Sequence, residues 1–152
     1  MSIKIISVGK KHEAWVVEGI ERYQKRLRAP FNVEWVLLPH SSYEGDRARQ
    51  EESERILSRL GTDDSVVLLD ERGKALDSPQ LSSLLTENFN QSRTVVLVIG
   101  GAYGVDATVH HRANTVWSLS PLVFPHQLVR LILAEQIYRA QQISLGGSYH
   151  HE

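Results

Sequence analysis

The sequence alternates regularly between short β-branched runs and longer stretches of helical periodicity, and this alternation restricts the fold more than any other feature. Five runs are predicted to be strands: Ile3–Val8, Val33–Leu38, Ser65–Leu69, Thr94–Ile99 and Thr115–Leu119. The predicted helices are His12–Arg28, Asp46–Leu60, a helix from the N-cap Ser78 to about Asn90, a short helix from the cap Asp106 to Arg112, and Pro125–Leu145. Strands that alternate with helices indicate an α/β fold, with a mostly parallel sheet flanked by helices.

Length and composition are typical of one soluble domain, and the chain contains no cysteine. The 152 residues contain no repeat and no Pro/Gly/Ser-rich linker, so residues 1–152 are expected to form a single domain. The absence of cysteine excludes a disulfide framework and a thiolate metal site. The formal net charge is −1, whereas proteins that coat naked nucleic acid are far more basic. Any contact with RNA is therefore expected to use a local patch or to occur within an assembly.

The N-terminal segment does not have the pattern of a targeting signal. Its apolar residues alternate with polar ones and soon reach Lys10 and Lys11, whereas a secretory signal has a charged start and then a longer apolar core. No apolar run approaches the roughly 18 residues of a membrane span. The expected compartment is the cytoplasm, and no membrane or DNA partner is expected.

Three loops are candidate ligand-binding segments, because open α/β sheets bind ligands outside the carboxyl ends of their strands. They are Asp70–Lys74, Gly100–Gly104 and Ser118–His126. The glycines of the second loop allow a close approach of backbone to ligand. The third loop has two prolines around an apolar run, and a rigid apolar loop with free backbone groups suits an adenine ring. Each loop also has a purely structural explanation, as a charged turn, a tight turn or a connector.

The glycine loop differs from known nucleotide fingerprints. A dinucleotide site reads GxGxxG after the first strand, with an acidic residue about 20 positions later. Here the order is GGxxG at Gly100–Gly104, it follows the fourth predicted strand, and no acid lies at that distance. NAD is therefore not the expected ligand, and no P-loop is present.

The last predicted helix is apolar around most of its first half, which favours a core together with a subunit interface, and hence a homodimer. Arg130 lies inside this run, where an unpaired charge is costly, so it must be paired or functional. Glu135 and Arg139 are four residues apart and are expected to form an ion pair. Gly146 and Gly147 are expected to end the helix.

The C-terminal tail carries Tyr149, His150 and His151, groups that can stack on an unpaired RNA base and hydrogen-bond to it. Two adjacent histidines without a carboxylate or cysteine at ligand spacing are weak evidence for a metal, so no metal site is predicted. The pair His110-His111 is equally weak evidence.

Seven motifs then occur together in order: IISVGK at 5–10, LDERGK at 69–74, VIGG at 98–101, LSPLVFPH at 119–126, LVR at 128–130, AEQIYRA at 134–140, and Tyr149-His150. With them the chain resembles, over essentially its whole length, the YbeA (RlmH) family of the SPOUT superfamily. These are bacterial 23S rRNA pseudouridine N3-methyltransferases. Two positions depart from the family pattern: His151 stands where a basic residue is common, and Tyr103 where a small or polar residue is usual.

The resemblance implies a SPOUT-type fold with a C-terminal trefoil knot, an exception to the usual absence of knots. It also implies a homodimer that uses S-adenosylmethionine to methylate N3 of a pseudouridine in 23S rRNA, within the assembled ribosome. The residues implied to bind the methyl donor are Leu69, Gly100, Leu119, Ser120, Pro121, Leu122, Val123 and Phe124.

On the substrate side, Tyr149, His150 and Arg130 are the candidates for aligning the base and helping its N3 proton to leave. Which of them acts as a base, if any does, stays open. Two alternatives also stay open: a SPOUT methyltransferase for a different RNA position, and a ribosome-associated module that binds nucleotide without turnover.

Overall fold

The structure is a computed structural model that describes residues 1–151. A parallel sheet forms its centre. The strand order is β2-β1-β4-β3-β5 and each pairing is parallel, which confirms the predicted α/β class. The strands are β1 (Ile3–Val8), β2 (Val33–Leu38), β3 (Ser65–Ala75), β4 (Val95–Ile99) and β5 (Thr115–Ser118). The trefoil knot stays a prediction.

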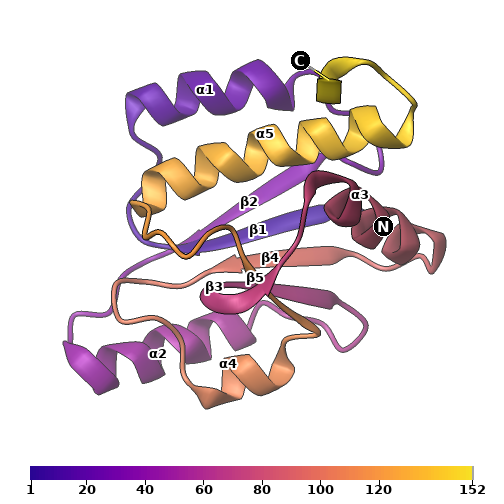
Figure 1. Ribbon diagram of the computed structural model, residues 1–152. Helices are drawn as coiled ribbons and strands as arrows, with labels where there is room; N and C mark the ends of the chain where they lie inside the picture. The colour runs from indigo at the N-terminus through magenta and orange to yellow at the C-terminus, as the bar shows by residue number, and fades with distance from the viewer. Residues whose placement is uncertain (152) are drawn as a thin grey trace.

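Helices cover both faces of the sheet (Figure 1). On one face lie α1 (Ala14–Gln24), α3 (Ser78–Asn90) and α5 (His126–Ser144), and α5 packs between the other two. On the opposite face lie α2 (Gly45–Leu57) and α4 (Ala107–Arg112). Each predicted helix is present, with ends that differ from the prediction by a few residues. No helix among residues 1–151 is long and apolar enough to cross a membrane.

Each face of the sheet has its own hydrophobic core. In β1, Ile3 and Ile5 pack with α3 and α5, whereas Ile6 and Val8 belong to the cluster on the α2 and α4 side. All four side chains are fully buried. Burial on both faces explains why the strands read as nearly continuous apolar runs rather than as alternating patterns.

The end of β3 differs from the prediction. Residues Asp70–Lys74 were expected to form a loop, but β3 continues to Ala75 and pairs with β5 after a register shift between Leu69 and Lys74. Gly73 permits this pairing, because a Cβ atom there would lie 2.6 Å from the carbonyl oxygen of Val116. Leu69 and Lys74 both pair with Trp117, so residues 70–73 bulge out of the ladder, and only Lys74 and Ala75 resume the pairing with β5. The segment is therefore a bulged part of β3 and not the separate loop that was predicted.

The cap of α3 also differs. Asp77, not Ser78, is the N-cap residue, and its side chain accepts a hydrogen bond of 2.8 Å from the backbone N–H of Gln80. The Gln80 side chain in turn accepts one from the Asp77 N–H, which completes a capping box. By contrast, Asp106 caps α4 as predicted, and Gly146, with φ of +72°, follows the end of α5 as predicted.

Candidate functional site

A pocket with a volume of about 360 Å³ lies where the chain leaves β3, β4 and β5. Its walls come from the end of β3, from the glycine turn after β4, and from the segment between β5 and α5. These are the three segments that the sequence singled out. They meet because the carboxyl ends of parallel strands lie at the same edge of the sheet.

The residues predicted to bind a methyl donor line this pocket, with one exception. The pocket-lining members are Leu69, Gly100, Leu119, Ser120, Leu122, Val123 and Phe124. The exception is Pro121, which is exposed on the same loop. Leu122 and Val123 are 69% and 81% exposed, so two apolar side chains remain available to cover a ligand or a partner.

Glycine is required at two positions of the turn after β4. A Cβ atom at Gly100 would lie 3.0 Å from a methyl group of Val105, and one at Gly101 would lie 2.5 Å from Oε1 of Glu52. Glu52 comes from α2 and is 3% exposed, so its buried carboxylate occupies the space next to Gly101 that a side chain would need. Gly100, Gly101 and Gly104 all line the pocket, so the backbone of the turn forms part of its wall.

The pocket has few polar side-chain groups. Trp117 lines the pocket, and its indole Nε1 is buried without a hydrogen-bond partner among the described residues. Asp70 forms an ion pair of 2.8 Å with Arg72, and His110 Nε2 lies 3.5 Å from the same carboxylate. The hydrogen bond from Arg72 lowers the pKa of Asp70. Apolar walls with a few fixed polar groups are typical of small-molecule sites.

Arg130 is held by neutral groups and not by a carboxylate. It is 1% exposed, and its Nε donates to Ser7 Oγ at 3.1 Å. Its Nη1 donates to the carbonyl of Lys10 at 2.8 Å and lies 3.3 Å from His12 Nδ1. Burial lowers the pKa of Arg130. The side chain does not line the pocket, so its predicted role toward the substrate stays a prediction.

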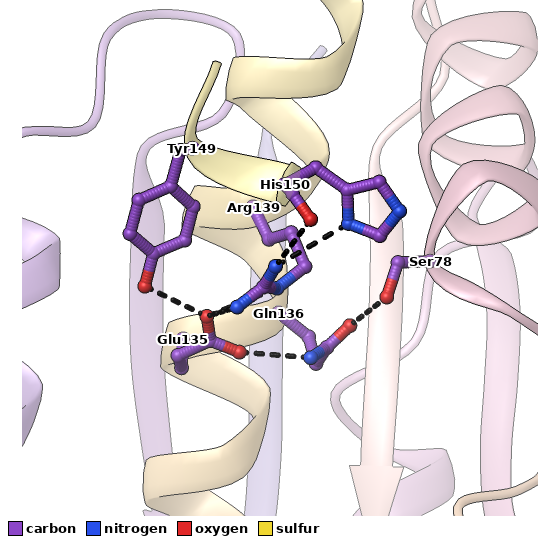
Figure 2. Close-up of polar contacts among 6 residues, drawn as sticks. All are labelled: Ser78, Glu135, Gln136, Arg139, Tyr149 and His150. Carbon is purple, nitrogen blue, oxygen red and sulfur yellow. Dashed lines mark hydrogen bonds and ion pairs between the residues drawn. The ribbon is translucent and has the colours of Figure 1, made fainter. Parts of the chain in front are cut away.

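The tail is docked against α5 through a polar network (Figure 2). It forms a short 3₁₀-helix, Tyr149–His151, and the Tyr149 hydroxyl donates to Glu135 Oε2 at 2.9 Å. Arg139 pairs with the same oxygen at 2.9 Å, which confirms the predicted ion pair, and its Nη1 lies 3.3 Å from His150 Nδ1. Burial and the bond to Glu135 raise the pKa of Tyr149, so the phenol stays neutral.

The same network reaches α3 through Gln136. The Gln136 side chain donates to Glu135 Oε1 at 2.8 Å and accepts a hydrogen bond of 2.7 Å from the Ser78 hydroxyl. Tyr149 and His150 do not line the pocket, and Figure 1 shows the tail at the end of α5 that lies away from the pocket loops. Within a single chain, Tyr149 and His150 therefore lie outside the pocket, and their predicted roles stay predictions.

His126 is a pocket residue to which the sequence assigned no role. It is the first residue of α5, it lines the pocket, and it is half-buried. Burial, and then the positive charge of Arg130, lower the pKa of His126. The signal available in the sequence was a histidine directly after a proline-bracketed loop, at the start of a helix. Among the described residues, no cluster of His, Asp and Glu side chains could hold a metal ion.

Comparisons with known proteins agree with this geometry. A family model described as a predicted SPOUT methyltransferase matches residues 1–150. A ribosomal RNA large subunit methyltransferase H from Desulfitobacterium hafniense is 40% identical over 99% of both chains. A protein of the same name from Alkalilimnicola ehrlichii is 42% identical over 99% of both chains. Another, from Hahella chejuensis, is 39% identical and is aligned over the full length of both.

A solved structure supports the fold independently of these sequence matches. A protein assigned to a methylase family, from Neisseria gonorrhoeae, superposes with a TM-score of 0.51 over 90% of this chain and 81% of its own, at 14% identity. At that identity the similarity concerns the fold alone. Together, the match over nearly the whole chain and the full-length relatives show that this protein belongs to the SPOUT methyltransferase family.

Proposed function

We propose that this chain transfers a methyl group from S-adenosylmethionine to N3 of a pseudouridine in large-subunit (23S) ribosomal RNA. The observation that carries the proposal is the convergence of three predicted loops on one pocket, with bare glycine backbone in its wall. The relatives are named ribosomal RNA large subunit methyltransferase H, which supports a ribosomal RNA substrate. The motifs that run from Ile5 to His150 support the finer assignment to N3 of pseudouridine.

Leu69, Gly100 and residues 119–124 would hold the methyl donor. Leu119 and Phe124 offer apolar surface to an adenine ring, and the backbone of the glycine turn offers polar groups at close range. Pro121 does not line the pocket and would act by restricting the loop backbone. When bound, S-adenosylmethionine supplies a methyl group on a positively charged sulfur.

The substrate side of the site would be completed by a second copy of the chain. Tyr149, His150 and Arg130 are the proposed substrate-side residues, yet none of them lines the pocket of its own chain. Two apolar side chains at that pocket, Leu122 and Val123, are largely exposed. A homodimer in which a neighbouring tail covers this surface would bring an aromatic ring and an imidazole to the bound base.

The near-neutral charge supports a substrate within the assembled ribosome. With a net charge of −1, the chain does not have the positive charge that a protein needs to bind naked RNA tightly at physiological salt. Neighbouring ribosomal surface would supply part of the affinity. Assembled ribosomes imply a cytoplasmic enzyme.

The test is methyl transfer from S-adenosylmethionine that carries a labelled methyl group. Assembled ribosomes, isolated large subunits and naked 23S rRNA are each incubated with the dimer, and we expect label in the assembled ribosomes above all. Calorimetry should show binding of S-adenosylmethionine but not of NAD, and Gly100→Val should block donor binding by filling the turn. A protein that binds the donor yet labels none of the three substrates would refute the proposed activity.

A further inference from the structure

Methylation at N3 requires that the nitrogen first lose its proton, because that proton occupies the position where the new bond forms. The lone pair left behind lies in the plane of the base and points where the N–H bond pointed. The proton acceptor and the methyl carbon must therefore approach N3 from the same side. A proton acceptor for this reaction has to border the donor pocket, and this requirement rests on the proposed function.

Four titratable side chains line the pocket: Asp70, Glu71, Arg72 and His126. Asp70 is occupied by Arg72 and His110, and the hydrogen bond from Arg72 lowers its pKa, which makes it a weaker base. Arg72 is a cation and has no free lone pair for a proton. Glu71 is exposed, so water competes for contact with its carboxylate. His126 is the pocket residue with the chemistry of a base that works near neutral pH.

The surroundings of His126 leave its ring available. Its imidazole is half-buried and makes no hydrogen bond within residues 1–151, and its backbone starts α5 directly after Pro125. Charged groups face it from three elements: Arg130 on its own helix, His40 after β2, and Glu52 on α2. Arg130 and His40 lower its pKa, whereas Glu52 raises it. Neutral imidazole is therefore the form present at pH 7.

Glu52 is the acidic group whose charge raises the pKa of His126. Its Oε2 accepts a hydrogen bond of 2.9 Å from the Ser41 N–H and lies 4.0 Å from His40 Nδ1. Its Oε1 is buried without a hydrogen-bond partner among the described residues. A buried carboxylate in this position favours a transient positive charge on His126, because little water screens the two groups from one another.

We propose that His126 is the proton acceptor of the methyl transfer. The N3–H bond breaks and the proton moves to a ring nitrogen of His126. The electron pair of N3 forms the bond to the methyl carbon. The carbon–sulfur bond breaks, and its electron pair stays on sulfur as a neutral thioether. His126 then releases the proton to water, so the imidazole is regenerated for the next turnover.

The test variant is His126→Asn, which keeps a polar side chain but accepts no proton. In single-turnover experiments on assembled ribosomes, we expect methylation to slow by about a hundredfold or more. The dissociation constants for S-adenosylhomocysteine and for ribosomes should change less than about threefold. His111→Asn is the matched control, since His111 is exposed on α4 and does not line the pocket, and it should keep the wild-type rate.

Two further readouts separate proton transfer from a structural role. The wild-type rate should rise with pH and level off at the pKa of His126 that an NMR titration of the free protein gives, whereas the rate of His126→Asn should keep rising. Glu52→Gln should lower that NMR pKa. The inference is wrong if His126→Asn keeps the wild-type rate or pH profile, or if it loses donor affinity in proportion to rate. A wild-type protein that methylates an atom other than N3 would instead refute the proposed function.

Discussion

Replacing Gly73 by alanine should loosen the end of β3 and, with it, one wall of the pocket proposed to bind the methyl donor. An added Cβ would lie 2.6 Å from the Val116 oxygen, 2.7 Å from the Val116 carbonyl carbon and 2.9 Å from the Trp117 nitrogen. All three are backbone atoms of β5, so no side-chain rotation relieves the contact. The two strands must move apart, and they carry Leu69 and Trp117 of the pocket.

The size of the effect follows from the cost of overpacking. Forcing extra atoms into a close-packed site typically costs about 1–3 kcal/mol. For a chain of this length, each kcal/mol lowers the melting temperature by roughly 2–4 °C, so we expect a decrease of about 2–12 °C. The affinity for S-adenosylhomocysteine should fall as well, because residues 70–72 line the pocket just before Gly73.

Scanning calorimetry and titration calorimetry measure the two effects, with Gly61→Ala as the matched control. At Gly61 the added Cβ would lie 3.4 Å from Asp64 Oδ2, an ordinary contact, so its melting temperature should stay within about 2 °C of wild type. Unchanged stability and affinity in Gly73→Ala would show that the end of β3 is not close-packed against β5. Equal losses in the two variants would contradict the role assigned to the contact.

Three further predictions concern assembly, the tail and pH. The wild type should sediment as a dimer at micromolar concentration, and Leu128→Asp or Ile132→Asp should give monomer or insoluble protein; Leu131 is less suitable, because it packs against Gly19 of α1. A wild-type monomer would contradict this. Deleting Tyr149–Glu152, of which Glu152 lies outside the described residues, should leave donor binding nearly intact and slow methylation roughly tenfold to a hundredfold, the equivalent of one lost base-stacking contact. A truncated protein with the wild-type rate would refute a substrate role for the tail. Burial lowers the pKa of His12 and of His126 below the ordinary histidine value of 6.5, so the unfolded chain takes up protons first and the free energy of unfolding should decrease as pH falls below about 6.5. Urea denaturation from pH 8 to pH 5 measures the free energy of unfolding, which should decrease less in His126→Asn than in the wild type. An identical decrease would mean that His126 has the same pKa in the folded and the unfolded protein.

The order and type of the elements could be predicted because apolar periodicity decides them, and β1 and β2 have the bounds predicted for Ile3–Val8 and Val33–Leu38. The end of β3 could not, since Asp70–Lys74 is polar, and the strand resumes at Lys74 only because Lys74 and Ala75 pair with residues more than 40 positions away. The cap of α3 was missed because Asp77 and Ser78 are both good N-cap residues, and the hydrogen bond with Gln80 decides between them.

The pocket itself was predictable from topology, because strand ends in a parallel sheet converge whatever their order. Seven of the eight residues predicted to bind the methyl donor line it, but the role of His126 and the position of the tail were not predicted. His126 lines it although His150 does not, and Tyr149 bonds Glu135 of its own α5. These are facts of three-dimensional packing between residues far apart in sequence, for which no spacing rule exists.

Nucleoside-resolved mass spectrometry of large-subunit rRNA tests the proposed function most directly. Ribosomes from cells without the gene are incubated with the protein and with S-adenosylmethionine that carries a heavy methyl group, and the rRNA is then digested to nucleosides. We predict that the heavy methyl group appears in 3-methylpseudouridine, at a single position of the large-subunit RNA. Heavy label in any other nucleoside, or in none, would contradict the assignment of this pocket to N3 methylation of pseudouridine.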